Sequence, residues 1–121
     1  VYMLNQVTLI GRVVETPALK KYETEYTATT LVLAVARPYK NMEGSYDTDF
    51  IRITLWNGVA QNACDYLQKG DIVGVKGRVT VKDVEISFSK EEENMKKKMM
   101  VTEIIGDRIC FIHSNRKKSE L

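Results

Sequence analysis

The sequence predicts a single all-β domain that carries one short helix. Five β-rich segments are separated by turn residues, and one further segment has apolar residues at helical spacing. Most strands are not followed by a helix, which argues against an alternating α/β fold. The length of 121 residues fits one domain, and a hydrophobic content of 44% is enough for a packed core.

Three strands are expected before the helix, at Gln6–Val14, Tyr26–Arg37 and Asp49–Trp56. Pro38 is expected to end the second strand, because proline lacks the amide hydrogen that a sheet ladder needs. A polar turn containing Asn41 and Gly44 should then lead into the third strand.

The helix is expected directly after the third strand. Asn57 is predicted as its N-cap and Gly70 as the residue just past its end. Two more strands follow, at Asp71–Val81 and Met99–Ile112. Three strands, one helix and two strands, in this order, match the OB-fold, a five-stranded Greek-key barrel.

The third strand is expected to place aromatic side chains on its outer surface, because side chains alternate along a strand. One face is aliphatic and should face the core; it carries Ile51, Ile53 and Leu55. The opposite face carries Phe50, Arg52, Thr54 and Trp56. Outward aromatic rings can stack on nucleic-acid bases, at about 1–3 kcal/mol per base. They can equally fill a subunit interface or pack under a loop.

The fourth strand is expected to add positive charge. Its predicted core face carries Val73, Val75, Val79 and Val81, and its outer face carries Lys76, Arg78 and Lys82. Gly74 and Gly77 indicate a bend or bulge in this strand. A charged outer face is often only solvated, but cations beside exposed aromatic rings are typical of single-stranded nucleic-acid binding.

Two loops could extend such a surface. The first carries Arg37, Tyr39, Lys40 and Tyr46, whose rings could clamp a strand or pack onto the barrel. The second, Lys90–Met100, has three acidic residues followed by three lysines. We expect it to be a solvated loop; a short helical turn with ion pairs, or an arm that touches phosphates, are the alternatives.

Composition excludes several other classes of protein. A net charge of +2 excludes a histone-like polycation and an acidic tail, but not a basic face. Cys64, Cys110 and His113 cannot supply the four ligands of a zinc site, and we expect the two thiols to be reduced and buried. Asp47 and Asp49 lack a third acid for a metal-dependent nuclease. We therefore expect no catalytic residues, no metal and no cofactor.

Neither a signal peptide nor an apolar run long enough to span a membrane is apparent, so no membrane partner and a cytoplasmic location are expected.

Several motifs together resemble the bacterial single-stranded DNA-binding proteins. In chain order they are Leu4–Arg12, Leu33–Asn41, Asp49–Ile51, Trp56, Ala60, Ala63, Tyr66–Gly70, Val75-x-Gly77-Arg78 and Val101–Glu103. The resemblance runs from about Met3 to Ile112. It implies an OB-fold homotetramer, with a dimer as the alternative, that coats single-stranded DNA in bacterial replication, repair and recombination, associated with the nucleoid.

The resemblance also assigns site residues. By position, the base-stacking aromatics of that family match Tyr39, Phe50 and Trp56, and basic residues near its DNA path match Lys21, Arg52 and Lys69. Together with the residues inferred from strand faces, the expected phosphate contacts are Lys21, Arg37, Lys40, Arg52, Lys69, Lys76, Arg78 and Lys82. Val84 stands where the family usually has an aromatic residue. Either Phe88 replaces it or one stacking position is lost, and Tyr46 is a further candidate for stacking.

The predicted organisation is an OB-fold DNA-binding domain at residues 1–113 and a short basic tail at 114–121. The acidic tail that recruits partner proteins in the family is absent from this sequence, so such partners are not expected. Other functions remain open from the residues alone. They are a primosomal-type or RNA-binding OB module, and a protein–protein adaptor that uses Phe50 and Trp56 as its surface.

Overall fold

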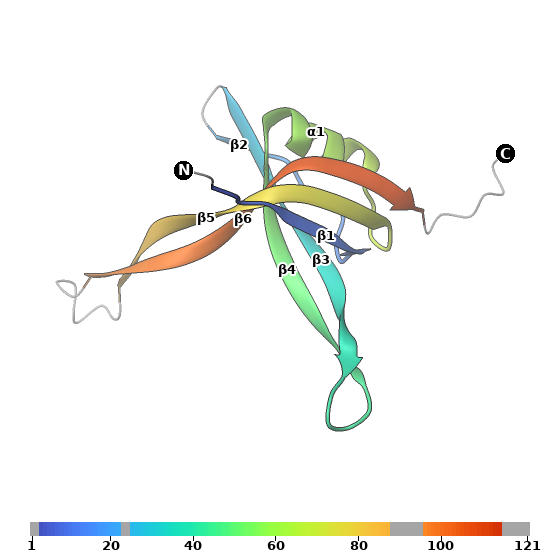
Figure 1. The fold of residues 1–121 in the computed structure, drawn as a ribbon. Coiled ribbons are helices and arrows are strands. Elements are labelled where there is room, and N and C mark those ends of the chain that lie inside the picture. Colours follow the sequence, from blue (N-terminus) through green and yellow to red (C-terminus); the bar gives the residue numbers. More distant parts are fainter. Residues whose placement is uncertain (1–2, 23–24, 88–95, 115–121) are drawn as a thin grey trace, which may run out of the picture.

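The computed structural model describes residues 3–22, 25–87 and 96–114 (Figure 1). Its elements are β1 (Val7–Val13), β2 (Lys20–Tyr22), β3 (Tyr26–Lys40), β4 (Tyr46–Trp56), α1 (Asn57–Tyr66), β5 (Ile72–Ser87) and β6 (Lys96–His113). The sheet order is β1-β5-β6-β4-β3-β2, and β1 also pairs with β3 through Arg12–Ala34 and Val13–Leu33. That last pairing closes five strands into a ring.

The ring confirms the predicted OB-fold barrel. The strand pairs are antiparallel, with the exception of β4 and β6, which run parallel to each other. Within the described residues the sheet has one strand more than predicted, because β2 pairs with the edge of β3 outside the ring. A strand of three residues is too short for its alternation to be recognised in sequence.

The core lies inside the barrel and under the helix. Leu31, Leu33, Ile53, Leu55 and Val73 are fully buried. The helix α1 adds Ala60 and Ala63, and Leu67 follows directly after it. The helix therefore covers one end of the barrel (Figure 1).

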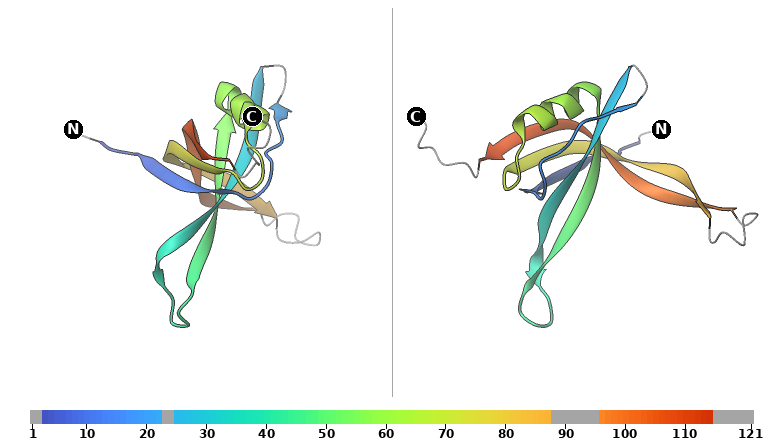
Figure 2. Two further views of the ribbon diagram at one scale, coloured as in Figure 1. Left: turned by 90° about the vertical axis from the view of Figure 1, so that its right-hand side faces the viewer. Right: turned by 180° about the vertical axis from the view of Figure 1, so that it is seen from behind.

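Two long hairpins leave the barrel in different directions. The β3–β4 hairpin extends away from the end that α1 covers, and the β5–β6 arm projects to the side (Figure 2). In this arm Val81 is 58% exposed and Val79 is half-buried, whereas Val73 and Val75 are buried. The prediction that Val81 faces the core is therefore wrong, because β5 has left the barrel by that point.

The predicted end of the second strand at Pro38 is also wrong. β3 continues through Pro38 to Lys40, which pairs with Tyr46. Pairing with β4 is irregular between Ala36 and Lys40, so the missing amide hydrogen falls where the ladder is already interrupted. The turn is confirmed: the Oδ1 atom of Asn41 accepts hydrogen bonds from backbone amides of the turn, and Gly44 has a φ of 83°.

The helix starts differently from the prediction. Trp56 is the N-cap residue and makes no side-chain cap, while Asn57 has a φ of 50°. The Oδ1 atom of Asn57 instead accepts a hydrogen bond from the Thr27 amide at 3.3 Å, which ties the helix start to β3. The helix ends at Tyr66, and Gly70, with a φ of 95°, lies in the turn that leads to β5.

The bend predicted at Gly77 is present. Register between β5 and β6 shifts at Lys76 and Gly77, where Asp107 is the extra residue on β6. A Cβ atom on Gly77 would overlap the backbone carbonyl of Ile105. Glycine is thus required where β5 passes the backbone of Ile105.

The segment Lys90–Met100 is described only from Lys96 onward. Residues Lys96 to Met100 belong to β6 and pair with β5. The predicted solvated loop is therefore wrong for residues 96–100, and so is a helical turn through these lysines. Residues 90–95 lie outside the described residues.

Candidate nucleic-acid interface

The outer face of β4 carries the predicted aromatic residues. Phe50 is 65% exposed, Trp56 is 41% exposed and Arg52 lies exposed between them, whereas Ile53 and Leu55 on the opposite face are fully buried. Tyr46 lies at the start of the same strand and is exposed as well. We call Tyr46, Phe50, Arg52 and Trp56 the β4 row.

The neighbouring strand leaves the β4 row uncovered. Ala34 pairs with Phe50, Val32 with Arg52 and Ala28 with Trp56, so small side chains lie beside the large ones. Phe50 and Trp56 are six residues apart, which is about 20 Å along a strand. The row is therefore long enough to contact several nucleotides of an extended strand.

A pocket of about 310 Å³ lies beside Trp56. Its walls come from β2, β3, β4, β5 and β6, and the residues that line it are Lys20, Ala28, Thr29, Thr30, Thr54, Trp56, Lys82 and Glu103. We call it the Trp56 pocket. Two of the predicted site residues, Lys82 and Trp56, thus line one pocket.

Sequence reasoning missed Lys20 in this pocket. Lys20 pairs with Ala28, which in turn pairs with Trp56, so the three residues share one face of the sheet. Lys21 pairs with Thr27 and lies on the other face. No pattern in the sequence indicates this difference, because β2 is too short to be recognised. Without β2, nothing in the sequence indicates which of the two lysines faces Trp56.

Three of the predicted phosphate contacts already bind carboxylates. Arg78 pairs with Asp107, Lys82 with Glu103 at 2.6 Å, and Arg37 with Asp49 at 3.0 Å. Within the described residues, five others are exposed and form no ion pair: Lys21, Lys40, Arg52, Lys69 and Lys76. The latter group is the more accessible to phosphates.

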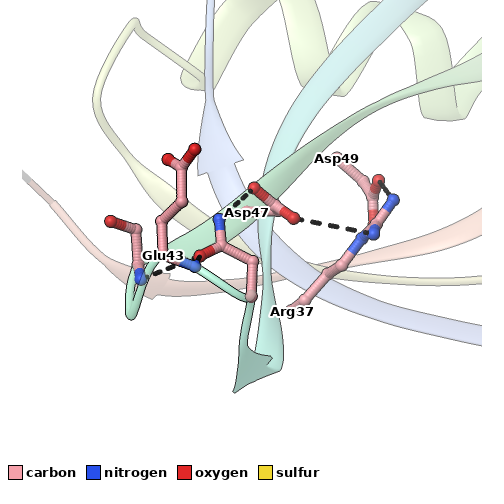
Figure 3. Close-up of polar contacts among 6 residues, drawn as sticks. Arg37, Glu43, Asp47 and Asp49 are labelled. Carbon is pink, nitrogen blue, oxygen red and sulfur yellow. Dashed lines mark hydrogen bonds and ion pairs between the residues drawn. The ribbon is translucent and has the colours of Figure 1, made fainter.

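The pairing of Arg37 organises the β3–β4 hairpin (Figure 3). Its Nε and Nη2 atoms donate to both carboxylate oxygens of Asp49, at 3.1 and 3.0 Å, and its Nη1 atom lies 3.8 Å from Asp47. Asp47 also accepts a hydrogen bond from Asn41 at 3.0 Å. The hydrogen bond from Arg37 lowers the pKa of Asp49, and the same bond raises the pKa of Arg37.

The two tyrosines of this hairpin are exposed, Tyr39 on β3 and Tyr46 on β4. The ammonium group of Lys40 lies 5.9 Å from the centre of the Tyr46 ring, within range of a cation–π contact. The hairpin therefore presents rings and positive charge together at a distance from the barrel.

The remaining predicted residues are spread over the molecule. Lys69 lies in the turn before β5, at the opposite end of that strand from Lys82. Lys76 lies between Thr8 of β1 and Arg108 of β6. Phe88 lies outside the described residues. The cations of β5 are thus not gathered at one place, although they alternate along one strand.

The cysteines also differ from expectation. Both are free, Cys64 is half-buried, and Cys110 is exposed on β6, so its predicted burial is wrong.

The only helix within the described residues has ten residues, too few to span a membrane.

Comparison with known proteins agrees with this geometry. Residues 4–112 match the single-strand binding protein family. The chain is 35% identical to "Single-stranded DNA-binding protein 3" of Listeria innocua over 94% of this chain and 67% of that protein. It is 36% identical to "Single-stranded DNA-binding protein B" of Bacillus subtilis over 91% of both chains.

A third relative, "Single-stranded DNA-binding protein 1" of Clostridium acetobutylicum, is 31% identical over 94% of this chain and 98% of that protein. The chain spans about two thirds of the length of several other relatives. The family match covers the whole barrel, the β4 row and the Trp56 pocket. This chain belongs to the single-strand binding protein family.

Proposed function

We propose that this chain binds single-stranded DNA along the β4 row. The observation that carries the proposal is the exposed series of Phe50, Arg52 and Trp56 beside small residues of β3, in a chain of this family. Bases stack on exposed rings regardless of their identity, and cations neutralise the phosphates between them. Binding of this kind is reversible, requires no catalytic residue and has no strong sequence preference.

In this mechanism Tyr39, Phe50 and Trp56 stack on bases. Arg52, Lys40, Lys76, Lys21 and Lys69 contact phosphates directly. Arg37, Arg78 and Lys82 contribute less per residue, because a phosphate must compete with the carboxylate that each already binds. The role that follows is the coating of single-stranded DNA during replication, repair and recombination at the bacterial nucleoid, in the cytoplasm.

We also propose that the protein acts as a homo-oligomer, with a tetramer as the expected state. Residues Val7–Gly11 of β1 pair with β5 on one side, and within the described residues their other edge is open. An open strand edge is a template for pairing with another chain. Ile10, Cys110 and Ile112 form an exposed apolar patch next to this edge, around Gly74.

The test is a fluorescence titration with oligo-dT, because Trp56 is the only tryptophan. We expect strong quenching, and an affinity whose logarithm falls linearly with the logarithm of salt concentration, at about 0.7 per phosphate contacted. Phe50→Ala should weaken binding by about 1–3 kcal/mol while Trp56 still reports it.

Tyr66→Ala is the matched control, since Tyr66 is an equally exposed ring on α1. Its affinity should equal that of the wild type. An adaptor function would instead predict no quenching by oligo-dT, and an affinity independent of salt would contradict the phosphate contacts.

A further inference from the structure

An acidic side chain lies within the surface proposed to bind DNA. Glu103 lines the Trp56 pocket, and its Oε2 atom is 2.6 Å from the Nζ atom of Lys82. Its side chain is 18% exposed, whereas the paired carboxylates of Asp49 and Asp107 are 46% and 52% exposed. A carboxylate held beside a bound DNA strand repels the phosphates of that strand. The presence of Glu103 in the pocket therefore points to an uncharged part of DNA, and not to a phosphate, as the group that the pocket binds.

The pairing of Glu103 with Lys82 changes what the pocket can bind. The two charges cancel, so a phosphate gains little there. Together they still offer a hydrogen-bond acceptor beside a donor. A nucleobase is uncharged and carries donors and acceptors along one edge, which is unpaired in single-stranded DNA. The volume of about 310 Å³ is at the lower end of the range for small-ligand sites.

A base stacked on Trp56 would present its edge to this pair, because both charged residues line the same pocket as the ring. Lys20 lines the pocket too and, within the described residues, forms no ion pair. It remains available for the adjoining phosphate. The pocket thus separates the recognition of a base from the neutralisation of the backbone.

We propose that the Trp56 pocket reads the base it holds and that Glu103 makes it favour cytosine over thymine. A carboxylate only accepts hydrogen bonds, and cytosine offers its N4 amino group where thymine has the O4 acceptor. Lys82 donates to the ring acceptor next to that amino group. This inference rests on the proposed DNA binding and adds to it a base preference at one position.

The experiment compares oligo-dC with oligo-dT of equal length, for the wild type and Glu103→Gln. Because the two homopolymers differ in other ways, the quantity measured is the ratio of their dissociation constants in each protein. We expect Glu103→Gln to shift this ratio about tenfold in favour of oligo-dT, since an amide can donate to thymine O4 as well as accept from cytosine. Glu103→Asp, which keeps the charge but shortens the side chain, should also reduce the preference.

Asp107→Asn is the matched control, because it also removes one acid that pairs with a cation of β5. It should raise the affinity for both oligonucleotides equally and leave their ratio unchanged. If Glu103→Gln does the same, Glu103 acts through charge alone and the proposed base reading is wrong. If the wild type binds neither oligonucleotide, the proposed function itself fails, which is a separate outcome.

Discussion

Arg37 lies between two carboxylates of its own hairpin, and these contacts give the residue a structural role. Its double hydrogen bond to Asp49 is a fixed, planar contact, and Asp47 lies on the other side at 3.8 Å. A guanidinium bound in this way holds the strands of the β3–β4 hairpin together. In the proposed DNA binding we therefore expect Arg37 to contribute less than it does to the hairpin.

The pairing predicts a pH dependence of the hairpin. The hydrogen bond from Arg37 lowers the pKa of Asp49 below its usual value of 3.8. A lowered pKa in the folded state means that the pairing stabilises the hairpin fully above the usual value and is lost as the pH falls through the lowered one. We expect NMR titration of the Asp49 carboxyl carbon to give a pKa below 3.8, and the amide shifts of Tyr39 and Tyr46 to follow it.

In Asp49→Asn these amide shifts should lose that acidic transition. A carboxyl pKa at the usual value would contradict the pairing in solution.

At the scale of elements, the close approach of β5 and β6 shapes the molecule. The pairing of the two strands shifts at Gly77, where β6 has the extra residue Asp107. Farther along, β5 and β6 leave the barrel together as an arm (Figure 1). The shift places Lys82 and Glu103 beside Trp56. The geometry of the pocket therefore depends on a glycine that does not line it.

Two glycines of β5 should respond differently to substitution by alanine. A Cβ atom at Gly77 would overlap the backbone of Ile105, and backbone atoms cannot move aside without breaking the ladder. At Gly74 the nearest atom is a side-chain carbon of Ile112 at 3.5 Å, an ordinary contact distance. We expect Gly77→Ala to lower the free energy of unfolding by about 2–4 kcal/mol and Gly74→Ala to change it by less than about 1 kcal/mol.

Urea unfolding at one fixed protein concentration measures both variants. Equal free energies of unfolding for the two variants would mean that β6 can move aside at Gly77. The Trp56 pocket would then be less rigid than the structure indicates.

At the scale of the whole molecule, one exposed apolar patch lies beside β1. Ile10 and Ile112 are exposed there next to the open edge of β1. Exposed apolar patches beside unpaired strand edges are typical of association surfaces. The β4 row lies on another strand, so the proposed association and the proposed DNA binding use different residues.

Ile10→Lys should therefore dissociate the proposed oligomer, since it places a charge within the patch. Val81→Lys is the matched control, because Val81 is also an aliphatic residue with 58% exposure but lies in the β5–β6 arm. Native mass spectrometry and light scattering should find smaller species for the first variant and an unchanged mass for the second. Identical masses for both variants would exclude this patch as the interface.

Much of the fold could be predicted because it depends on local patterns. The burial of Ile53 and Leu55 and the exposure of Phe50 and Trp56 follow from alternation along a single strand, and the structure confirms them. The missed strand β2 and the continuation of β3 through Pro38 depend on pairing with distant residues. Neither feature produces a pattern among neighbouring residues from which it could be predicted.

The amino-acid sequence by itself determined the barrel and the aromatic face of β4, because periodicity of apolar residues reports which side of a strand is buried. Only the tertiary structure decided which cations lie beside that face. Lys20 and Lys82 lie beside Trp56, while Arg37, Arg78 and Lys82 each bind a carboxylate. The physical reason is that the interaction of charges depends on the distances between them. Strand register, the register shift at Gly77 and the closure of the barrel set these distances, and the order of the residues in the chain does not.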